Sequence, residues 1–359
     1  MRVWLGLIVL GVFGLTKAVA AEFAPVVPGV ALQFPRDFGA HPAFKTEWWY
    51  LTGWLKLPDG KPAGFQVTFF RSATGLAGDN PSAFAPRQLI FGHAALSDGR
   101  SGRFLHEQKI ARAGLGLAEA AEGNTQVSID DWQLFRQPDG RYQTRIVSPS
   151  FEYQFTLAPS QPLLLQGEAG FSRKGRAPGQ ASYYYSEPHL KLSGQLRYQG
   201  KTETVTGEAW LDHEWSSEVL AGGTVGWDWA GINLDDGGAL TLFRLRDAAG
   251  ATRWAGGSRR WPDGRSVALA PEAIRLTPQQ SWTSSRTGTP YPVSMALEVS
   301  SPSPERWLLQ PLLQDQEFDA RPTTGALYWE GAVRAIQQGK EVGRGYLELT
   351  GYGKQALKM

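Results

Sequence analysis

The sequence predicts an all-β protein made of two tandem antiparallel β-barrel domains packed against each other. Three observations lead to this prediction. Glycine and proline are abundant, with 42 Gly and 23 Pro in 359 residues, so turns should be frequent and long helices are not expected. Short apolar and aromatic runs alternate with Asp-Gly turns, and one pattern of strands occurs twice along the chain.

Asp-Gly pairs between apolar runs are typical of β-hairpins. Residues 65–71 and 239–245, which lie beside two of these pairs, are rich in β-branched and aromatic side chains, as strands are. No stretch keeps a 3.6-residue apolar period between capping residues, so helices of ordinary length are not predicted. The turns are Asp59-Gly60, Asp98-Gly99, Asp139-Gly140, Asp236-Gly237 and Asp263-Gly264.

The internal repeat predicts two related β domains. In each half, an aromatic segment, 48–55 or 227–232, leads through an Asp-Gly turn into a strand that ends in Phe-Arg. A second pair of similar segments, 194–211 and 331–349, ends the two halves. Antiparallel sheets of this size usually avoid exposed edges by closing into barrels. We place the junction at the glycine-rich residues 220–223, which gives an N-terminal domain of residues 22–219 and a C-terminal domain of residues 220–359.

The first 21 residues have the order of a secretory signal peptide. Arg2 precedes an apolar run from Val3 to Leu15, and the small residues Ala18-Val19-Ala20-Ala21 follow. The apolar run is shorter than the roughly 20 residues that a membrane-spanning helix needs. We therefore expect cleavage after Ala20 or Ala21 and a periplasmic or secreted mature protein.

Composition narrows the classes of partner. The chain has 36 basic and 34 acidic residues without runs of one sign, which argues against binding to nucleic acid. It contains no cysteine, so no disulfide and no lipid anchor on cysteine is expected. Its 14 Trp and 11 Tyr suit either a bulky core or a cavity for a lipophilic small molecule. Contact with a membrane surface is left open.

Several kinds of catalytic centre have no motif in the chain. It lacks His-Glu-x-x-His, a Gly-x-Ser-x-Gly elbow and a glycine-rich phosphate loop. The five histidines lie far apart in sequence, so a metal site would have to be assembled by the fold. We therefore expect no resident cofactor and predict no metal site.

The segment 210–215 is the densest cluster of polar and aromatic residues that the sequence contains. In an extended strand, alternation places Asp212 and Glu214 on one face and His213 and Trp215 on the other. A histidine beside a tryptophan wall is a candidate proton donor, whereas the structural alternative is a histidine hydrogen-bonded at a barrel mouth. The carboxylates of Asp212 and Glu214 also have an alternative role: they cap a loop or bind a cation.

Two further acids and a tyrosine run are candidates. Glu47 precedes Trp48-Trp49-Tyr50 and either takes part in catalysis or forms an ion pair with Arg71 or Arg244 that closes a barrel end. Asp228 is the sharper candidate for an acid with a raised pKa, although alternation places it opposite its neighbouring tryptophans. The phenols of residues 183–185 either orient a ligand or pack at a sheet edge.

Long aromatic-rich strings give the chain a family resemblance over about residues 40–355. Thr46-Glu47-Trp48-Trp49-Tyr50, Tyr183-Tyr184-Tyr185-Ser186, residues 207–217 and Trp227-Asp228-Trp229 resemble the carotenoid 1,2-hydratase and AttH family of secreted proteins. The resemblance implies two packed lipocalin-like β-barrel domains. It also implies, as the best-known activity, cofactor-free hydration of a terminal double bond of an acyclic carotenoid by way of a tertiary carbocation.

The resemblance assigns a functional His-x-Trp pair to His213 and Trp215, and an indole face can stabilise a nearby cation. The family's catalytic Asp follows a Tyr on a later strand, but residues 240–245 hold no Tyr-x-Asp string, so Asp228 is a substitute candidate. The predicted catalytic residues are His213, Trp215 and Asp228. The predicted ligand-binding residues are Glu47, Trp49, Arg71, Tyr184, Tyr185, Asp212 and Trp229.

Two functions follow as hypotheses. In the first, the exported protein encloses an isoprenoid, carotenoid or other lipid and adds water to an alkene by acid catalysis. In the second, it is a non-catalytic periplasmic module that binds a lipophilic molecule and works with an ABC-type export system. Both need the same apolar cavity, and the missing Tyr-x-Asp string favours binding alone or a different reaction.

Overall fold

A computed structural model of the chain describes residues 23–75, 80–82, 84–218, 220 and 222–353, so the predicted signal peptide and residue 221 of the predicted junction lie outside the described residues. Strands dominate this part of the chain, and its helices are two single turns of 3-10 helix, η1 (Arg36–Phe38) and η2 (Pro271–Ala273). The all-β prediction is confirmed. Within the described residues, no helix is long and apolar enough to cross a membrane.

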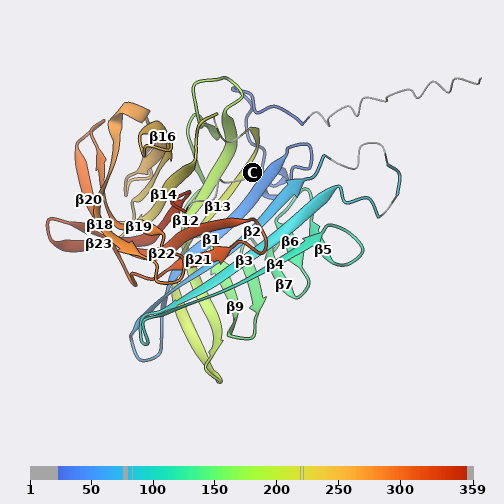
Figure 1. The fold of residues 1–359 in the computed structure, drawn as a ribbon, viewed down its shortest axis with the longest axis horizontal. Helices are drawn as coiled ribbons and strands as arrows, with labels where there is room; N and C mark the ends of the chain where they lie inside the picture. The colour runs from blue at the N-terminus through green and yellow to red at the C-terminus, as the bar shows by residue number, and fades with distance from the viewer. Residues whose placement is uncertain (1–22, 76–79, 83, 219, 221, 354–359) are drawn as a thin grey trace, which may run out of the picture.

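The first β unit is an antiparallel sheet that curls into a nearly closed barrel (Figure 1). Its main path runs β4-β3-β2-β1-β13-β12-β9-β8-β7-β6-β5, and two short strands, β10 and β11, pair with β12. The strands are β1 (Thr46–Lys56), β2 (Pro62–Ala73), β3 (Gln88–Asp98), β4 (Arg103–Arg112), β5 (Ala118–Ala120), β6 (Gln126–Ile129), β7 (Trp132–Arg136), β8 (Tyr142–Val147), β9 (Phe151–Ala158), β10 (Leu164–Leu165), β11 (Phe171–Arg173), β12 (Ala181–Tyr198) and β13 (Lys201–Glu218).

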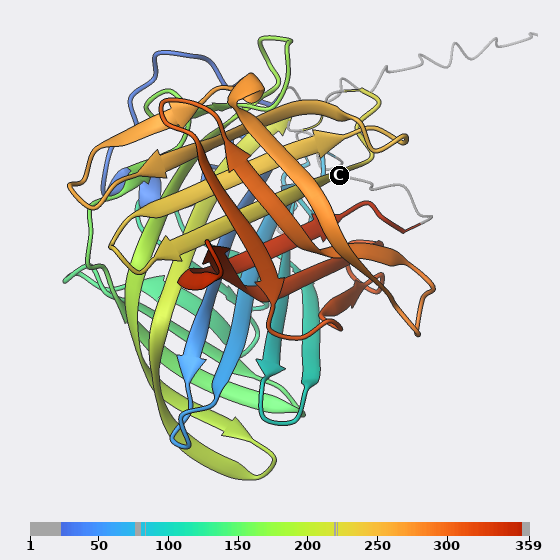
Figure 2. The same ribbon diagram turned by 90° about the vertical axis from the view of Figure 1, so that its left-hand side faces the viewer.

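The second β unit is a separate antiparallel sheet that packs against one side of the first (Figure 2). Its path runs β17-β16-β15-β14-β23-β22-β20-β19-β18, with β21 paired to β22. The strands are β14 (Gly226–Leu234), β15 (Ala239–Arg246), β16 (Thr252–Arg260), β17 (Ser266–Leu269), β18 (Ile274–Thr283), β19 (Pro290–Val299), β20 (Glu305–Pro311), β21 (Glu317–Ala320), β22 (Ala326–Gln337) and β23 (Lys340–Thr350).

The sequence repeat corresponds to a repeat in topology. The order β3-β2-β1-β13-β12 in the first unit matches β16-β15-β14-β23-β22 in the second. Each early aromatic strand therefore pairs both with the strand that ends in Phe-Arg and with the last strand of its own unit. Equivalent sequence segments thus occupy equivalent places in the two sheets.

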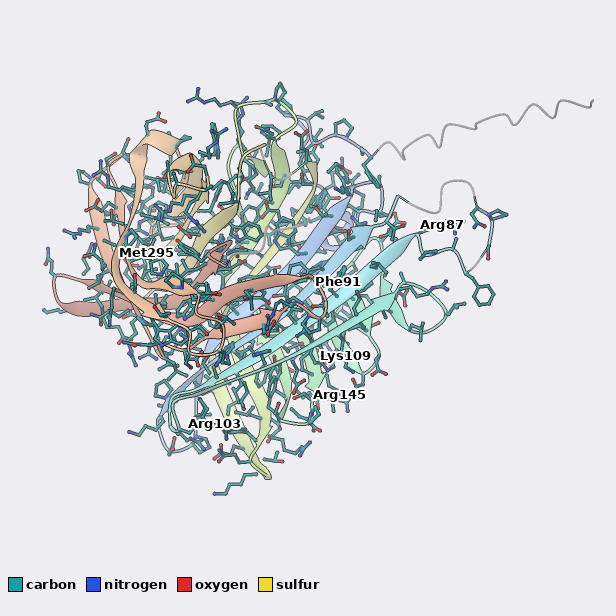
Figure 3. The ribbon with its side chains drawn as sticks, viewed as in Figure 1. Arg87, Phe91, Arg103, Lys109, Arg145 and Met295 are labelled. Atoms are coloured by element: carbon teal, nitrogen blue, oxygen red, sulfur yellow. The ribbon has the colours of Figure 1, made fainter. Side chains whose placement is uncertain are left out.

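Three apolar clusters follow from the alternation of side chains. One fills the first barrel and one fills the second unit, where Met295 of β19 is fully buried (Figure 3). The third lies between the two units and contains Tyr50, Trp54, Trp210 and Trp229. β1 and β13 therefore have two buried faces, one toward the barrel interior and one toward the second unit. This double burial explains why segment 210–215 has no solvent-exposed side.

Candidate functional site

The alternation predicted for residues 210–215 is present in β13 and creates two polar clusters back to back. His213 and Trp215 point to the interior of the first barrel, where both are almost fully buried. Asp212 and Glu214 point to the second unit and are also buried. We call the first group, His41, Glu47, Arg71, Tyr185 and His213, the mouth cluster, because its strand residues lie at one end of the barrel.

The carboxylate of Glu47 is the centre of the mouth cluster. Its Oε1 atom lies 2.7 Å from Nδ1 of His41 and 2.8 Å from Nε2 of His213. Its Oε2 atom accepts hydrogen bonds from Nε of Arg71 at 2.8 Å and from the backbone N–H of His41 at 2.8 Å. The ion pair between Glu47 and Arg71, one of the two roles considered for Glu47, is therefore present in the structure.

The segment that precedes β1 covers the barrel mouth and supplies His41. Arg71 fixes this segment by donating hydrogen bonds to the backbone carbonyls of His41 and Phe44, both at 2.9 Å. The His41 ring stacks on Trp215 with 3.7 Å between centroids, and the His213 ring stacks on Trp49 at 4.6 Å. An indole ring thus covers one face of each imidazole.

Each imidazole of the mouth cluster has a second hydrogen-bond partner. Nε2 of His41 lies 3.3 Å from Oδ1 of Asp37, and Nδ1 of His213 lies 3.0 Å from the hydroxyl of Tyr185. Burial lowers the pKa of His213 to about 4, although the neighbouring Glu47 works in the opposite direction. Burial also lowers the pKa of His41, but its hydrogen bonds to Asp37 and Glu47 outweigh burial, so the net shift is upward.

The interdomain cluster, Tyr184, Ser186, Trp210, Asp212 and Trp229, lies on the opposite face of β13. The Asp212 carboxylate accepts hydrogen bonds from the Tyr184 hydroxyl at 2.6 Å, the Ser186 hydroxyl at 2.5 Å and the Trp210 indole at 2.6 Å. Trp229 of the second unit donates its indole N–H to the Tyr184 hydroxyl at 3.1 Å. Burial raises the pKa of Asp212 to about 7, although the three hydrogen bonds favour its ionised form.

A cleft of about 380 Å³ opens between the two units beside this cluster. Its aromatic wall consists of Trp54, Trp210 and Tyr346, which are nearly buried. Charged side chains also line it: Lys56, Glu208, Asp235, Glu341 and Arg344. Trp210 belongs to both the cleft wall and the interdomain cluster, and its hydrogen bond to Asp212 connects the two.

Asp228 belongs to neither cluster. It faces the interior of the second unit, where it accepts hydrogen bonds from Arg244 at 2.5 Å, Arg246 at 3.0 Å and the Tyr352 hydroxyl at 2.8 Å. The structure therefore does not bring Asp228 to His213, and the carboxylate beside His213 is Glu47 instead. Alternation along β14 is the reason, because Trp227 and Trp229 occupy the face toward the first unit.

The ten predicted site residues thus divide among three places. The mouth cluster and its indole walls contain Glu47, Trp49, Arg71, Tyr185, His213 and Trp215; the interdomain cluster contains Tyr184, Asp212 and Trp229; and Asp228 lies in the second unit.

The profile of the AttH-like family matches residues 25–352 of the chain. The chain belongs to the AttH-like family.

Solved structures agree with this membership. A protein of Nitrosomonas europaea described as an AttH is 52% identical, with a TM-score of 0.85 over 92% of this chain and 100% of its own. Kievitone hydratase of Nectria haematococca has a TM-score of 0.69 at 13% identity, over 93% of this chain and 97% of its own. CghA with Sch210972 has a TM-score of 0.53 at 14% identity, over 95% and 96%. The last two similarities concern the fold alone. A comparison with curated protein sequences finds no match.

Sequence reasoning missed His41 and most of the cleft. His41 reaches Glu47 only because the covering segment folds back over the barrel mouth, and its spacing of six residues from Glu47 fits no regular motif. Trp54 and Tyr346 were visible as members of the repeated aromatic segments, but the repeat does not show which faces of two sheets meet. The pairing of the two units decides that.

Proposed function

We propose that this AttH-like protein is exported and binds a lipophilic small molecule, such as an isoprenoid, a carotenoid or another lipid, in the cleft between its two β units. The observation that carries the proposal is the cleft of about 380 Å³ with its aromatic wall. Small-molecule sites are concave and often lie between domains. This cleft combines aromatic side chains with several charged ones, so it suits a ligand that has a polar part as well as an apolar one. The family membership and the similarity to kievitone hydratase support a lipocalin-like fold of the hydratase type.

The contacts of the cleft residues suit an amphipathic ligand. Trp54 is held in place by a hydrogen bond from its indole N–H to the carbonyl of Gly345 at 3.0 Å. The guanidinium of Arg344 lies 5.0 Å from the centre of the Trp54 ring. The Arg344 side chain is half exposed and forms an ion pair with Glu341, which also lines the cleft. An apolar chain would pack against the indoles while a polar end group stays near Arg344.

Binding of a fluorescent polyene tests the proposal. Truncation of a buried aromatic anchor commonly costs about 2 kcal/mol or more, so Trp210→Ala should weaken binding by at least tenfold. Trp261→Ala is the matched control, because Trp261 lies on a turn of the second unit and does not line the cleft. Arg344→Ala is a rim variant that leaves the core intact and should weaken binding less. Equal affinity in wild type, Trp210→Ala and Arg344→Ala would remove the cleft as the binding site.

Hydratase-type turnover is a second candidate function, and the contact between Trp210 and Asp212 favours it. Trp210, which lines the cleft, donates its indole N–H to the buried carboxylate of Asp212, and the Tyr184 hydroxyl donates to the same carboxylate. In acid-catalysed hydration, a proton adds to one alkene carbon, water bonds to the cation at the other carbon, and the oxygen then loses a proton, so the net change is addition of H₂O. The indole of Trp210, which lines the cleft, would stabilise the cation.

Asp212→Asn separates the two candidates. If the protein hydrates its ligand, this variant should lose turnover of an acyclic carotenoid or related alkene while it still binds the polyene. If the protein only binds, wild type itself should show no turnover, and the second hypothesis, a binding module that serves an ABC-type export system, should stand.

Export is the remaining element of the proposal. N-terminal sequencing of protein from the periplasmic fraction should find Ala21 or Glu22 as the first residue, because the charged, apolar and small-residue regions of a signal peptide occur in order. An intact Met1 on cytoplasmic protein would contradict export and leave the cleft proposal standing.

A further inference from the structure

Three side chains of the mouth cluster present their donor atoms to one point. Nδ1 of His41, Oε1 of Glu47 and Nε2 of His213 all lie within 4.8 Å of one another. They come from the covering segment, from β1 and from β13, so no short sequence motif unites them. Two imidazole nitrogens and one carboxylate oxygen are the donor set of His₂Glu zinc sites.

We propose that His41, Glu47 and His213 bind a zinc ion at the mouth of the first barrel. Zinc bonds of about 2.0–2.2 Å in tetrahedral geometry would hold the donor atoms roughly 3.3 Å apart. Oε1 of Glu47 now lies 2.7 Å and 2.8 Å from the two ring nitrogens, so it would have to move away from both. The two nitrogens, which lie within 4.8 Å of each other, would have to settle at the spacing that zinc sets. Rotation of the His41 side chain, which is 14% exposed, provides that adjustment and a path for the ion.

The outer contacts of the three donors have the arrangement that metal ligands require. A ligating imidazole usually donates its other N–H to a carboxylate, carbonyl or similar acceptor, which fixes the ring. Asp37 lies beside the free nitrogen of His41, and the Tyr185 hydroxyl lies beside that of His213. Asp37 is itself oriented by the backbone N–H of Gln33 at 2.6 Å. A hydrogen-bond partner therefore fixes the ring of His41 and that of His213 at the nitrogen that does not face Glu47.

Arg71 determines how Glu47 would coordinate. Its Nε occupies Oε2 of the carboxylate, so only Oε1 is available and coordination would be monodentate. The positive charge of Arg71 opposes a cation, and the Asp37 carboxylate offsets it from the far side of His41. Asp37 is itself paired with Arg36, so the carboxylates of Glu47 and Asp37 balance the guanidiniums of Arg71 and Arg36 when both histidines are neutral.

Three protein ligands leave one tetrahedral position for water or a substrate oxygen, which is the ligand count of catalytic rather than structural zinc sites. The indole N–H of Trp49, whose ring stacks on His213, is buried and has no acceptor among the described residues, so a water at the mouth cluster is a candidate acceptor for it. Zinc fits the N₂O donor set better than Mg²⁺ or Ca²⁺, which prefer oxygen ligands throughout.

Zinc titration of the chelator-treated, mature protein tests the proposal, with a chromophoric chelator as competitor and intact protein mass as a second readout. Wild type should bind one zinc ion per chain, and His41→Ala and Glu47→Gln should each reduce the affinity by at least a hundredfold. Asp37→Asn should reduce it by about 10–100-fold, since outer-shell partners have effects of that size. His106→Ala is the control and should bind as wild type does.

Cobalt provides a readout that is independent of folding defects. Co²⁺ added to wild type should give the intense visible absorption of a tetrahedral site, and zinc should displace it. His41→Ala removes the hydrogen bonds to Asp37 and Glu47 and the stack on Trp215, so it should melt below wild type without metal. Zinc should raise the melting temperature of wild type and leave that of His41→Ala unchanged. Failure of folded wild type to bind zinc, or equal binding by His41→Ala, would overturn the proposal. Polyene binding in the cleft would be unaffected by either result.

Discussion

The mouth of the first barrel and the equivalent end of the second unit contain the same acid–arginine pair with different surroundings. Glu47 pairs with Arg71 across β1 and β2, and Asp228 stands opposite Arg244 across β14 and β15. Both acids are fully buried. The repeat thus placed an acid at the start of one strand and an arginine near the end of the next in both units.

The remaining partners of the two acids differ in kind. Around Asp228 they are a second guanidinium, Arg246, and the Tyr352 hydroxyl, so every polar neighbour is a permanent donor. Around Glu47 they are two imidazoles, His41 and His213, which can donate a proton or offer a lone pair. The pair itself therefore serves the fold, whereas the histidines of the first unit provide chemistry that the second unit lacks.

Removal of the acid in the second unit should have the largest effect on stability. Asp228→Ala leaves Arg244 and Arg246 as buried charges without an anion, so the free energy of unfolding should fall by about 3–5 kcal/mol. Urea unfolding measures this, and zinc binding of the folded fraction should remain as in wild type. A fall below about 1 kcal/mol would mean that Asp228 does not hold this end of the sheet together.

A buried acid without an arginine partner should make the stability of the protein fall as the pH rises. Glu348, which faces the first unit, accepts hydrogen bonds from Trp227 and Thr350, and burial raises its pKa to about 7. In the unfolded chain this group ionises near its ordinary value, so the folded state holds the proton between about pH 4.5 and 7. Stability should therefore fall as pH rises through this window and level off above it.

Glu348→Gln imitates the protonated form and should remove that dependence. Between pH 5 and pH 8, wild type should lose about 1–3 kcal/mol more stability than the variant, as measured by urea unfolding at each pH. The same slope in both proteins would assign the pH dependence to other groups.

A matched pair of tyrosine variants separates the roles of the two acid sites. Tyr352→Phe removes the hydroxyl on Asp228, and Tyr185→Phe removes the hydroxyl on Nδ1 of His213, so each should cost about 1 kcal/mol of stability for one buried hydrogen bond. Only Tyr185→Phe should also weaken zinc binding, by about 10–100-fold. Equal zinc affinities in the two variants would show that the Tyr185 contact has no role in orienting His213.

The smallest effect is expected for an acid–arginine pair at the surface. Asp263 contacts Arg265 at 2.6 Å, but both side chains are at least half exposed. Asp263→Asn should change the free energy of unfolding by less than about 0.5 kcal/mol, because exposed pairs contribute little. A change as large as that of Asp228→Ala would show that burial does not determine the strength of these pairs.

Much of the fold could be predicted because it depends on local rules. The Asp-Gly pairs, including Asp59-Gly60 and Asp236-Gly237, lie at turns between consecutive antiparallel strands, and the alternation of His213 with Asp212 follows from the two-residue period of a strand. The ion pair of Glu47 followed from the cost of burying a lone charge, although the choice between Arg71 and Arg244 needed the strand register.

The rest of the site depends on contacts between distant segments. His41 lies on irregular chain whose path over the barrel has no sequence period, so its approach to His213 could not be predicted. The cleft depends on which faces of two similar sheets pack together. From the sequence, Asp228 is the sharper candidate acid because it lies between two tryptophans. The partners that hold it in the second unit, Arg246 and Tyr352, come from β15 and from the segment after β23, and no local pattern connects them to Asp228.

Native mass spectrometry of the protein purified from the envelope of cells that express it is the decisive test of the ligand site. We expect a mature chain that begins at Ala21 or Glu22 and carries one non-covalent lipophilic molecule, and we expect that Trp210→Ala loses this molecule while Trp261→Ala keeps it. A mature wild-type chain without any lipophilic adduct, or the same adduct on Trp210→Ala, would contradict a ligand site between the two β units.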